Sequence, residues 1–205
     1  MEEFISKILL LSFIAAVTPG PLMALLISET LKHGKTSGLK IAITPFFADL
    51  PIMLIGIFVL SKLENINDVL GIISLFGACY LLYLAYGCIT TKNVHLQTKA
   101  NPKSFTKGII ANFLNPNPYI FYFSILAPII IRAMKINPLY APLSVVVFLG
   151  LFVLIMIIIV LFVHTAKAFF NSQHYVYVIR ALGLILAYFA LSFFYDGLRF
   201  LKIIY

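Results

Sequence analysis

The sequence has few charged residues and no polar stretch long enough to form a soluble domain. Only 11% of its 205 residues are charged, whereas 62% are hydrophobic and the mean hydropathy is +1.05. A soluble domain needs a polar surface, which this composition does not supply. The sequence therefore predicts an integral membrane protein with a single membrane domain over residues 1–205. It excludes a separate catalytic head, and we expect no enzyme.

Cysteine is scarce as well. The two cysteines, Cys79 and Cys88, are nine residues apart on one expected helix. That spacing separates them by about 13.5 Å along the helix axis and places them on opposite faces. They therefore cannot form a disulfide with each other.

The chain also lacks a concentrated basic region, although its net charge is +8. Lys and Arg lie in short connections between apolar runs, which indicates topology signals and no nucleic-acid partner. The first, third and fifth connections with their flanks hold nine of these residues, and the other side holds six. The positive-inside rule then places both termini outside. The acidic start, Met1-Glu2-Glu3, does not fit a secretory signal, so we expect the first span to be retained.

Six apolar runs are long enough to cross a bilayer as helices. They cover approximately Phe4–Glu29, Thr36–Ser61, Asn67–Thr91, Phe105–Ile131, Tyr140–Val163 and Tyr175–Ile203. The sequence thus predicts an all-α protein of six transmembrane helices embedded in the lipid bilayer of the cytoplasmic membrane. The fifth run has no ionisable residue between its ends, which favours a lipid-facing helix.

Two of these runs are interrupted by a doubled proline. The motifs are Thr18-Pro19-Gly20-Pro21 and Asn115-Pro116-Asn117-Pro118, at an offset of 97 residues. With three spans in each half, the second half enters the membrane from the opposite face. We therefore expect two inverted three-helix repeats, about 1–91 and 105–205, joined by a connection over 92–104. Paired helix breaks of this kind are typical of substrate sites in secondary transporters.

The residues of the two breaks have a common chemistry. Thr18 and Asn115 are good N-cap residues, and each is followed by a proline where a helix would begin. Each break should therefore start a half-helix whose free N–H groups, around Leu22–Ala24 and Tyr119–Phe121, can hold an anion such as a carboxylate. The alternative is a pair of proline kinks that only shape helix packing.

Asp49 is an acid near the middle of the second run, and it has no Lys, Arg or His three or four residues away. An acid at this depth is a functional-site hypothesis, because a buried charge is costly to keep. We expect Asp49 to find a cation on another span or to stay protonated. The alternative is a structural acid satisfied by backbone groups that Pro45 and Pro51 leave free. Asn112 shares a helix face with Asn115, either to contact substrate or to bond neighbouring helices.

Three segments resemble the LysE/RhtB family of amino-acid exporters. The first family signature is similar to the segment AAVTPGPLMALLISETLKHGKTSGLKIAITPFFADLP. The family segment that opens the second half is similar to FTKGIIANFLNPNPYIFYFSILAPII, and the third span of the family is similar to GACYLLYLAYG. The resemblance covers nearly the whole chain. It implies substrate-path roles for Pro19, Gly20, Pro21, Asp49, Asn112, Asn115 and Pro116. The segment Ile43–Ala48 is bulkier than in the family and has an added proline.

Together these features predict a secondary active exporter of amino acids or similar small zwitterions, driven by protons and without a cofactor or metal. The candidate site comprises Thr18 and the residues implied by the resemblance. A homo-oligomer is left open. Two other classes also remain: a membrane thiol-disulfide conduit, which needs cysteines placed to pair, and an accessory subunit that carries no cargo.

Overall fold

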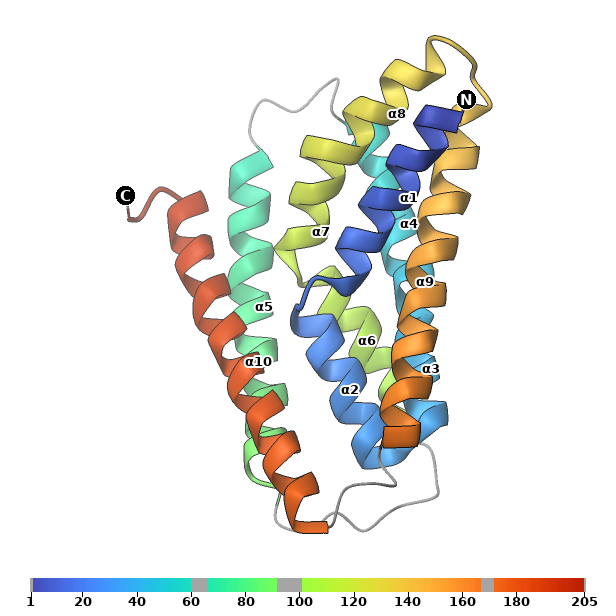
Figure 1. The fold of residues 1–205 in the computed structure, drawn as a ribbon. Helices are drawn as coiled ribbons and strands as arrows, with labels where there is room; N and C mark the ends of the chain where they lie inside the picture. Colours follow the sequence, from blue (N-terminus) through green and yellow to red (C-terminus); the bar gives the residue numbers. More distant parts are fainter. Residues whose placement is uncertain (1, 60–65, 92–100, 167–171, 205) are drawn as a thin grey trace.

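The computed structural model describes residues 2–59, 66–91, 101–166 and 172–204, and every regular element in these ranges is helical (Figure 1). The first half contains α1 (Glu2–Val17), α2 (Pro21–His33), α3 (Lys35–Ala42), α4 (Thr44–Val59) and α5 (Ile66–Ile89). The second half contains α6 (Ser104–Phe113), α7 (Pro116–Phe121), the π-helical turn η1 (Tyr122–Leu126), α8 (Ala127–Met134), α9 (Tyr140–Ala166) and α10 (Ser172–Phe200).

The helices provide up to six membrane crossings. Within the described ranges, four helical stretches are long and apolar enough to cross alone, and two bent helix pairs add two crossings if each pair is one span. The α1–α2 pair bends by 59° and the pair that α6 makes with the helix after Pro116 bends by 51°. Both bends fall at the doubled prolines, where missing N–H groups interrupt the helical hydrogen bonds.

The two bent crossings run in opposite directions (Figure 1). α1 starts at the end of the bundle that holds the N-terminus, and α2 continues to the far end. α6 starts at that far end, and α7 and α8 return towards the first one. The described ends of the chain lie at the same end of the bundle, which fits an even number of crossings.

α5 and α10 form the most extensive helix pair of the bundle, side by side along their lengths (Figure 1). Two glycines bring their backbones together. A Cβ on Gly71 would lie 3.2 Å from the carbonyl oxygen of Gly197, and a Cβ on Gly197 would lie 3.2 Å from that of Gly71. Close approach at small residues is a typical way for helices to associate in a bilayer.

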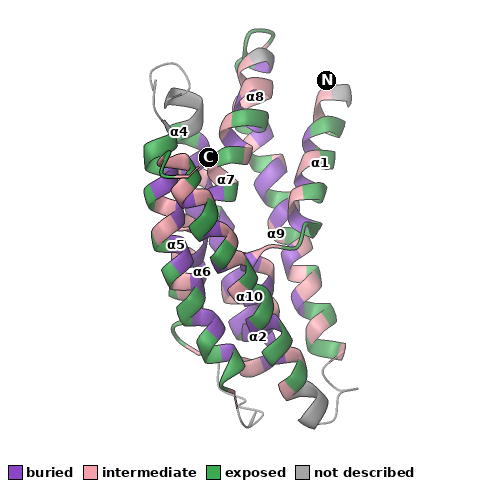
Figure 2. Ribbon diagram, turned by 90° about the vertical axis from the view of Figure 1, so that its left-hand side faces the viewer, coloured by how far each residue is buried: buried purple, intermediate pink, exposed green. Residues whose placement is uncertain are grey.

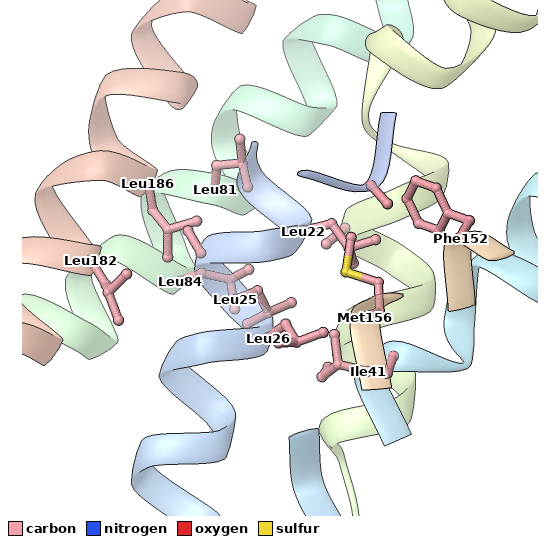
Figure 3. Packing of buried hydrophobic residues seen from close by; sticks show 14 of the residues in the cluster. Leu22, Leu25, Leu26, Ile41, Leu81, Leu84, Phe152, Met156, Leu182 and Leu186 are labelled. Atoms are coloured by element: carbon pink, nitrogen blue, oxygen red, sulfur yellow. The ribbon is translucent and has the colours of Figure 1, made fainter. Parts of the chain in front are cut away.

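α2 lies at the centre of the hydrophobic core. Leu22, Leu25 and Leu26 are buried, and the cluster around them combines leucines of α5 and α10 with Ile41 of α3 and with Phe152 and Met156 of α9 (Figure 3). Exposed residues lie mostly on the outward faces of the surrounding helices (Figure 2). A helix that is buried all round fits its position inside a bundle.

The structure corrects the expectation for the fifth run. α9 has one exposed stripe, which includes Leu154 and Ile158, but Phe148 and Val160 are completely buried. It packs against α1, α2, α3, α4 and α8. α9 is therefore a core helix with one lipid-facing side.

Candidate functional site

A cavity of about 230 Å³ lies where the two helix breaks meet. Its wall contains the end of α1, both breaks, Asp49 of α4, Asn112 of α6, Tyr122 of η1, and Phe152 and Met156 of α9. The volume is below the ~300–1,000 Å³ of pockets for drug-sized ligands, so the cavity suits a small solute. Thr18, Pro19 and Asn117 line it and are exposed, so it reaches the molecular surface at the level of the breaks.

Asp49 is the buried acid of this cavity, and 2% of it is exposed. Its Oδ1 accepts a hydrogen bond of 2.6 Å from the Asn112 side-chain amide, and its Oδ2 accepts one of 2.7 Å from the Tyr122 hydroxyl. Both donors are neutral side chains. The two hydrogen-bond partners of Asp49 are therefore neither a cation on another span nor backbone groups freed by Pro45 and Pro51. The other expectation, that Asp49 stays protonated, remains a prediction.

Local sequence features place the two donors. Asn112 is in the last turn of α6, directly before the second break. Tyr122 begins the π-helical turn, which ends with the N–H of Ala127 donating to the Tyr122 carbonyl. Pro128 follows and has no N–H to continue an ordinary turn. Single π turns are frequent at functional sites.

The first break has a different N-cap from the expected one. Thr18 still belongs to the end of α1, because its hydroxyl and its N–H both donate to the carbonyl of Ile14. Gly20 is the N-cap of α2 and Pro21 is the first helical residue. The N–H groups of Leu22 and Met23 have no partner within the helix, and both residues line the cavity. Two of the three free N–H groups predicted here, those of Leu22 and Met23, are thus present. The third, that of Ala24, donates to the carbonyl oxygen of Gly20 and is not free.

The second break confirms the predicted N-cap and corrects the predicted anion site. Asn115 caps α7, and its Oδ1 accepts a 3.0 Å hydrogen bond from the N–H of Asn117. Pro116 and Pro118 have no N–H. The first three positions of α7 therefore offer no free donor. Tyr119–Phe121, where the sequence predicted the free N–H groups, lie beyond the unpaired positions of the helix start, so an anion has no backbone group to bind there.

Two glycines set the shape of the site. A Cβ on Gly20 would meet nothing closer than the Thr18 carbonyl oxygen at 4.0 Å, so the break leaves room for a ligand beside the backbone. A Cβ on Gly77 of α5 would overlap the Leu114 carbonyl oxygen. Only glycine permits this approach of α5 to the second break.

Most residues of the predicted site are brought together. Seven of the eight line the cavity: Thr18, Pro19, Gly20, Pro21, Asp49, Asn112 and Asn115. Pro116 is buried beside it and is not part of the wall. Tyr122 was missed by sequence reasoning, although it follows Asn115 by seven residues, or about two helical turns. Among the described residues, no group of three or more His, Cys, Asp or Glu is placed to hold a metal ion.

Comparison with known proteins adds one finding. A family model described as LysE type translocator matches residues 13–197, which is nearly the whole chain. No curated protein and no solved structure matches the sequence.

Proposed function

The chain belongs to the LysE type translocator family, a family of membrane transporters, and on this premise we propose that it is a proton-coupled exporter of amino acids or similar small zwitterions. The proposal includes the cytoplasmic membrane as the location. Export of small molecules such as amino acids is what the family membership implies. The central cavity supports the finer parts of the proposal: the cargo, its coupling to protons and the residues that bind it.

One observation carries the proposal: the central cavity has two features suited to the two charges of a zwitterion. The free N–H groups of Leu22 and Met23 are at the positive end of the α2 dipole, which favours a carboxylate. The Asp49 carboxyl group provides an acceptor for an ammonium group. Its two present partners occupy two of about four lone-pair positions, so it has capacity for a further donor.

In the proposed cycle, the cargo carboxylate binds at the start of α2 and the ammonium group binds at Asp49. Release outside leaves the Asp49 carboxylate without its cation, and a proton replaces the cation. The protonated protein returns inward and gives the proton up to the cytoplasm. A proton that enters down the membrane potential supplies about 2.3 kcal/mol per 100 mV, enough for a roughly fortyfold cargo gradient.

We further propose that the two halves are inverted repeats that rock against each other, with both termini outside. The opposite directions of the two bent crossings support the repeat (Figure 1), and the bias of Lys and Arg supports the orientation. An impermeant reagent should then reach a C-terminal tag in intact cells but not a cysteine introduced within 92–104. The opposite labelling pattern would reverse the orientation and leave the transport proposal intact.

The direct test is transport by the purified chain in liposomes with an imposed proton gradient. We expect the parent to accumulate amino acids against their gradient and Asp49→Asn to lose this activity, because an amide neither titrates nor pairs with an ammonium group. Asp196→Asn is the matched control, since Asp196 is on α10 and outside the cavity wall. Proton-coupled transport at the parental rate by Asp49→Asn would contradict the proposal.

The same assay tests the other two classes. A thiol-disulfide conduit needs a cysteine pair, whereas Cys79 is exposed, Cys88 is buried and both are free. Transport by a variant with both cysteines replaced by serine would exclude that function. Transport by the chain alone would exclude an accessory subunit without cargo.

A further inference from the structure

A second cavity, of about 260 Å³, lies near the far end of α2 from the first break. Its wall comes from the last two turns of α2, the last two turns of α5 and Lys107 of α6. Tyr83 and Tyr86 line it and are about 70% exposed, at 69% and 70%, so the cavity reaches the surface. The two tyrosines are six and three residues before the end of α5 at Ile89. This position suits the aromatic belt of a membrane–water interface.

The α2 wall of this cavity contains two charged residues of opposite sign, each with partners other than its neighbour on the helix. Glu29 and Lys32 are three residues apart, a spacing that places their Cβ atoms about 5–6 Å apart on one face of the helix. Glu29 forms its ion pair with Lys107, at 2.6 Å, and it also accepts from the Ser104 hydroxyl at 2.6 Å. Lys32 donates instead to the Gly87 carbonyl oxygen at 2.9 Å and to the Cys88 sulfur at 3.3 Å.

Both groups have hydrogen-bonding capacity left. An ammonium group has three donors, and Lys32 uses two of them on neutral acceptors. A carboxylate has about four acceptor positions, and Glu29, which is 3% exposed, uses two. The third Lys32 donor suits a carboxylate, and the remaining Glu29 positions suit an ammonium group.

We propose that this second cavity binds a small zwitterion, with its carboxylate on Lys32 and its ammonium group on Glu29. A simple anion would gain Lys32 but face the Glu29 carboxylate, and a simple cation would gain Glu29 but face Lys32 and Lys107. Glu29 already has Lys107 as its counter-ion, whereas Lys32 has only neutral partners, so the carboxylate of a zwitterion supplies the missing counter-charge. The ammonium group of the same molecule then donates to the remaining Glu29 positions and offsets the repulsion between the two carboxylates. The binding itself stands on this geometry; its role as a waiting site before the central cavity rests on the proposed function.

Cys88 provides a reporter for occupancy, because its sulfur contacts Lys32 and lies in the wall of the second cavity. In a Cys79→Ser background it is the only cysteine. The probe is an equimolar mixture of amino acids without cysteine, and the readout is the rate at which a small thiosulfonate reagent modifies Cys88. Two matched mixtures serve as controls: carboxamides, which lack the carboxylate, and N-acetyl derivatives, which lack the ammonium group.

We expect the amino-acid mixture to slow the modification several-fold and the two control mixtures to leave it unchanged. Lys32→Gln should abolish the protection, whereas Lys35→Gln should keep it, because Lys35 is exposed at the same end of the bundle and outside the cavity wall. Protection equal to the parent in Lys32→Gln, or equal protection by either control mixture, would overturn the proposal.

A second measurement does not depend on the reactivity of Cys88. In a Gly20→Leu background, which fills the central cavity, the amino-acid mixture should still raise the thermal unfolding midpoint, and Lys32→Gln added to it should remove the shift. No shift in the Gly20→Leu background would refute the second site. The proposed function would still hold if the parent transports amino acids and Asp49→Asn does not. A failure of the second binding site can therefore be distinguished from a failure of the proposed function.

Discussion

The hydrogen bond between Tyr122 and Asp49 offers a measurement of the charge on the buried acid. Tyr122→Phe removes the hydroxyl that donates to Oδ2 at 2.7 Å and keeps the ring, which packs edge-on against Phe121 and Phe148. A hydrogen bond to a charged group contributes about 1.5–3 kcal/mol, and one between neutral groups about 0.5–1.5 kcal/mol. The loss of stability in Tyr122→Phe therefore depends on whether Asp49 is ionised.

A double-mutant cycle separates the two cases. We expect Tyr122→Phe to cost about 1 kcal/mol more in the parent than in an Asp49→Asn background, the difference between the midpoints of the two ranges. Tyr119→Phe is the matched control, because the Tyr119 hydroxyl donates to the Phe113 carbonyl at 3.0 Å and not to Asp49. Its cost should be equal in both backgrounds.

Reversible unfolding in mixed detergent micelles provides the free energies, and proteoliposome transport provides the functional readout. Tyr122→Phe should reduce coupled transport, because the carboxylate is held in place by one donor less. A coupling energy of zero, equal to that of the Tyr119 control, would refute an ionised Asp49 in the resting protein. The cavity would then contain a neutral acid in this conformation.

Three further outcomes test the shape of the central site. Gly20→Leu should fold and be stabilised less than the parent by amino acids against heating, because its side chain enters the central cavity and leaves only the second cavity to bind them. Gly150→Leu on α9, where a Cβ meets nothing within 4 Å, should keep the parental stabilisation. Gly77→Ala should lower the yield of folded protein, because its Cβ would overlap the Leu114 carbonyl oxygen, whereas Gly87→Ala on the same helix has open space. Asn115→Ala should lower the unfolding free energy by about 1 kcal/mol through loss of the α7 cap, and an unchanged value would contradict the capping role.

Much of the helical architecture could be predicted because its signals are local. Membrane helices need long apolar runs, and the two doubled prolines coincide with the bends of 59° and 51°. Asp49 stood out for a similar reason, as an acid in an apolar run. The break between α3 and α4 at Ile43 was not predicted, although Pro45 follows it and removes an N–H donor.

The first N-cap was mispredicted because two local interactions compete for one hydroxyl. Thr18 can cap a following helix or donate to the preceding turn, and Ile14 lies four residues before it. The carbonyl of Ile14 accepts the hydroxyl at 2.6 Å, so α1 extends to the break and Gly20 assumes the cap position. Asn115 caps its helix with a side-chain bond to Asn117, as predicted.

Contacts between distant segments could not be predicted. Tyr122 and Asp49 are 73 residues apart, and one sequence contains no signal for their pairing. The orientation of α9 was hidden for another reason. Lipid and the protein core are both apolar, so a fully apolar helix does not reveal which of its faces is buried. Phe152, which lines the cavity, and Leu154, which is exposed, look alike in the sequence.

The two breaks differ in a way that bears on how protonation and movement are linked in the proposed cycle. The first presents free N–H groups at the start of α2, whereas the second presents side chains, with Asn115 occupied by its own cap. Asp49 belongs to the first half, yet both of its donors, Asn112 and Tyr122, belong to the second. Their hydrogen bonds are stronger while Asp49 is charged and weaken when it takes up a proton. Protonation therefore loosens a contact between the halves, which is the change that rocking of one half against the other requires.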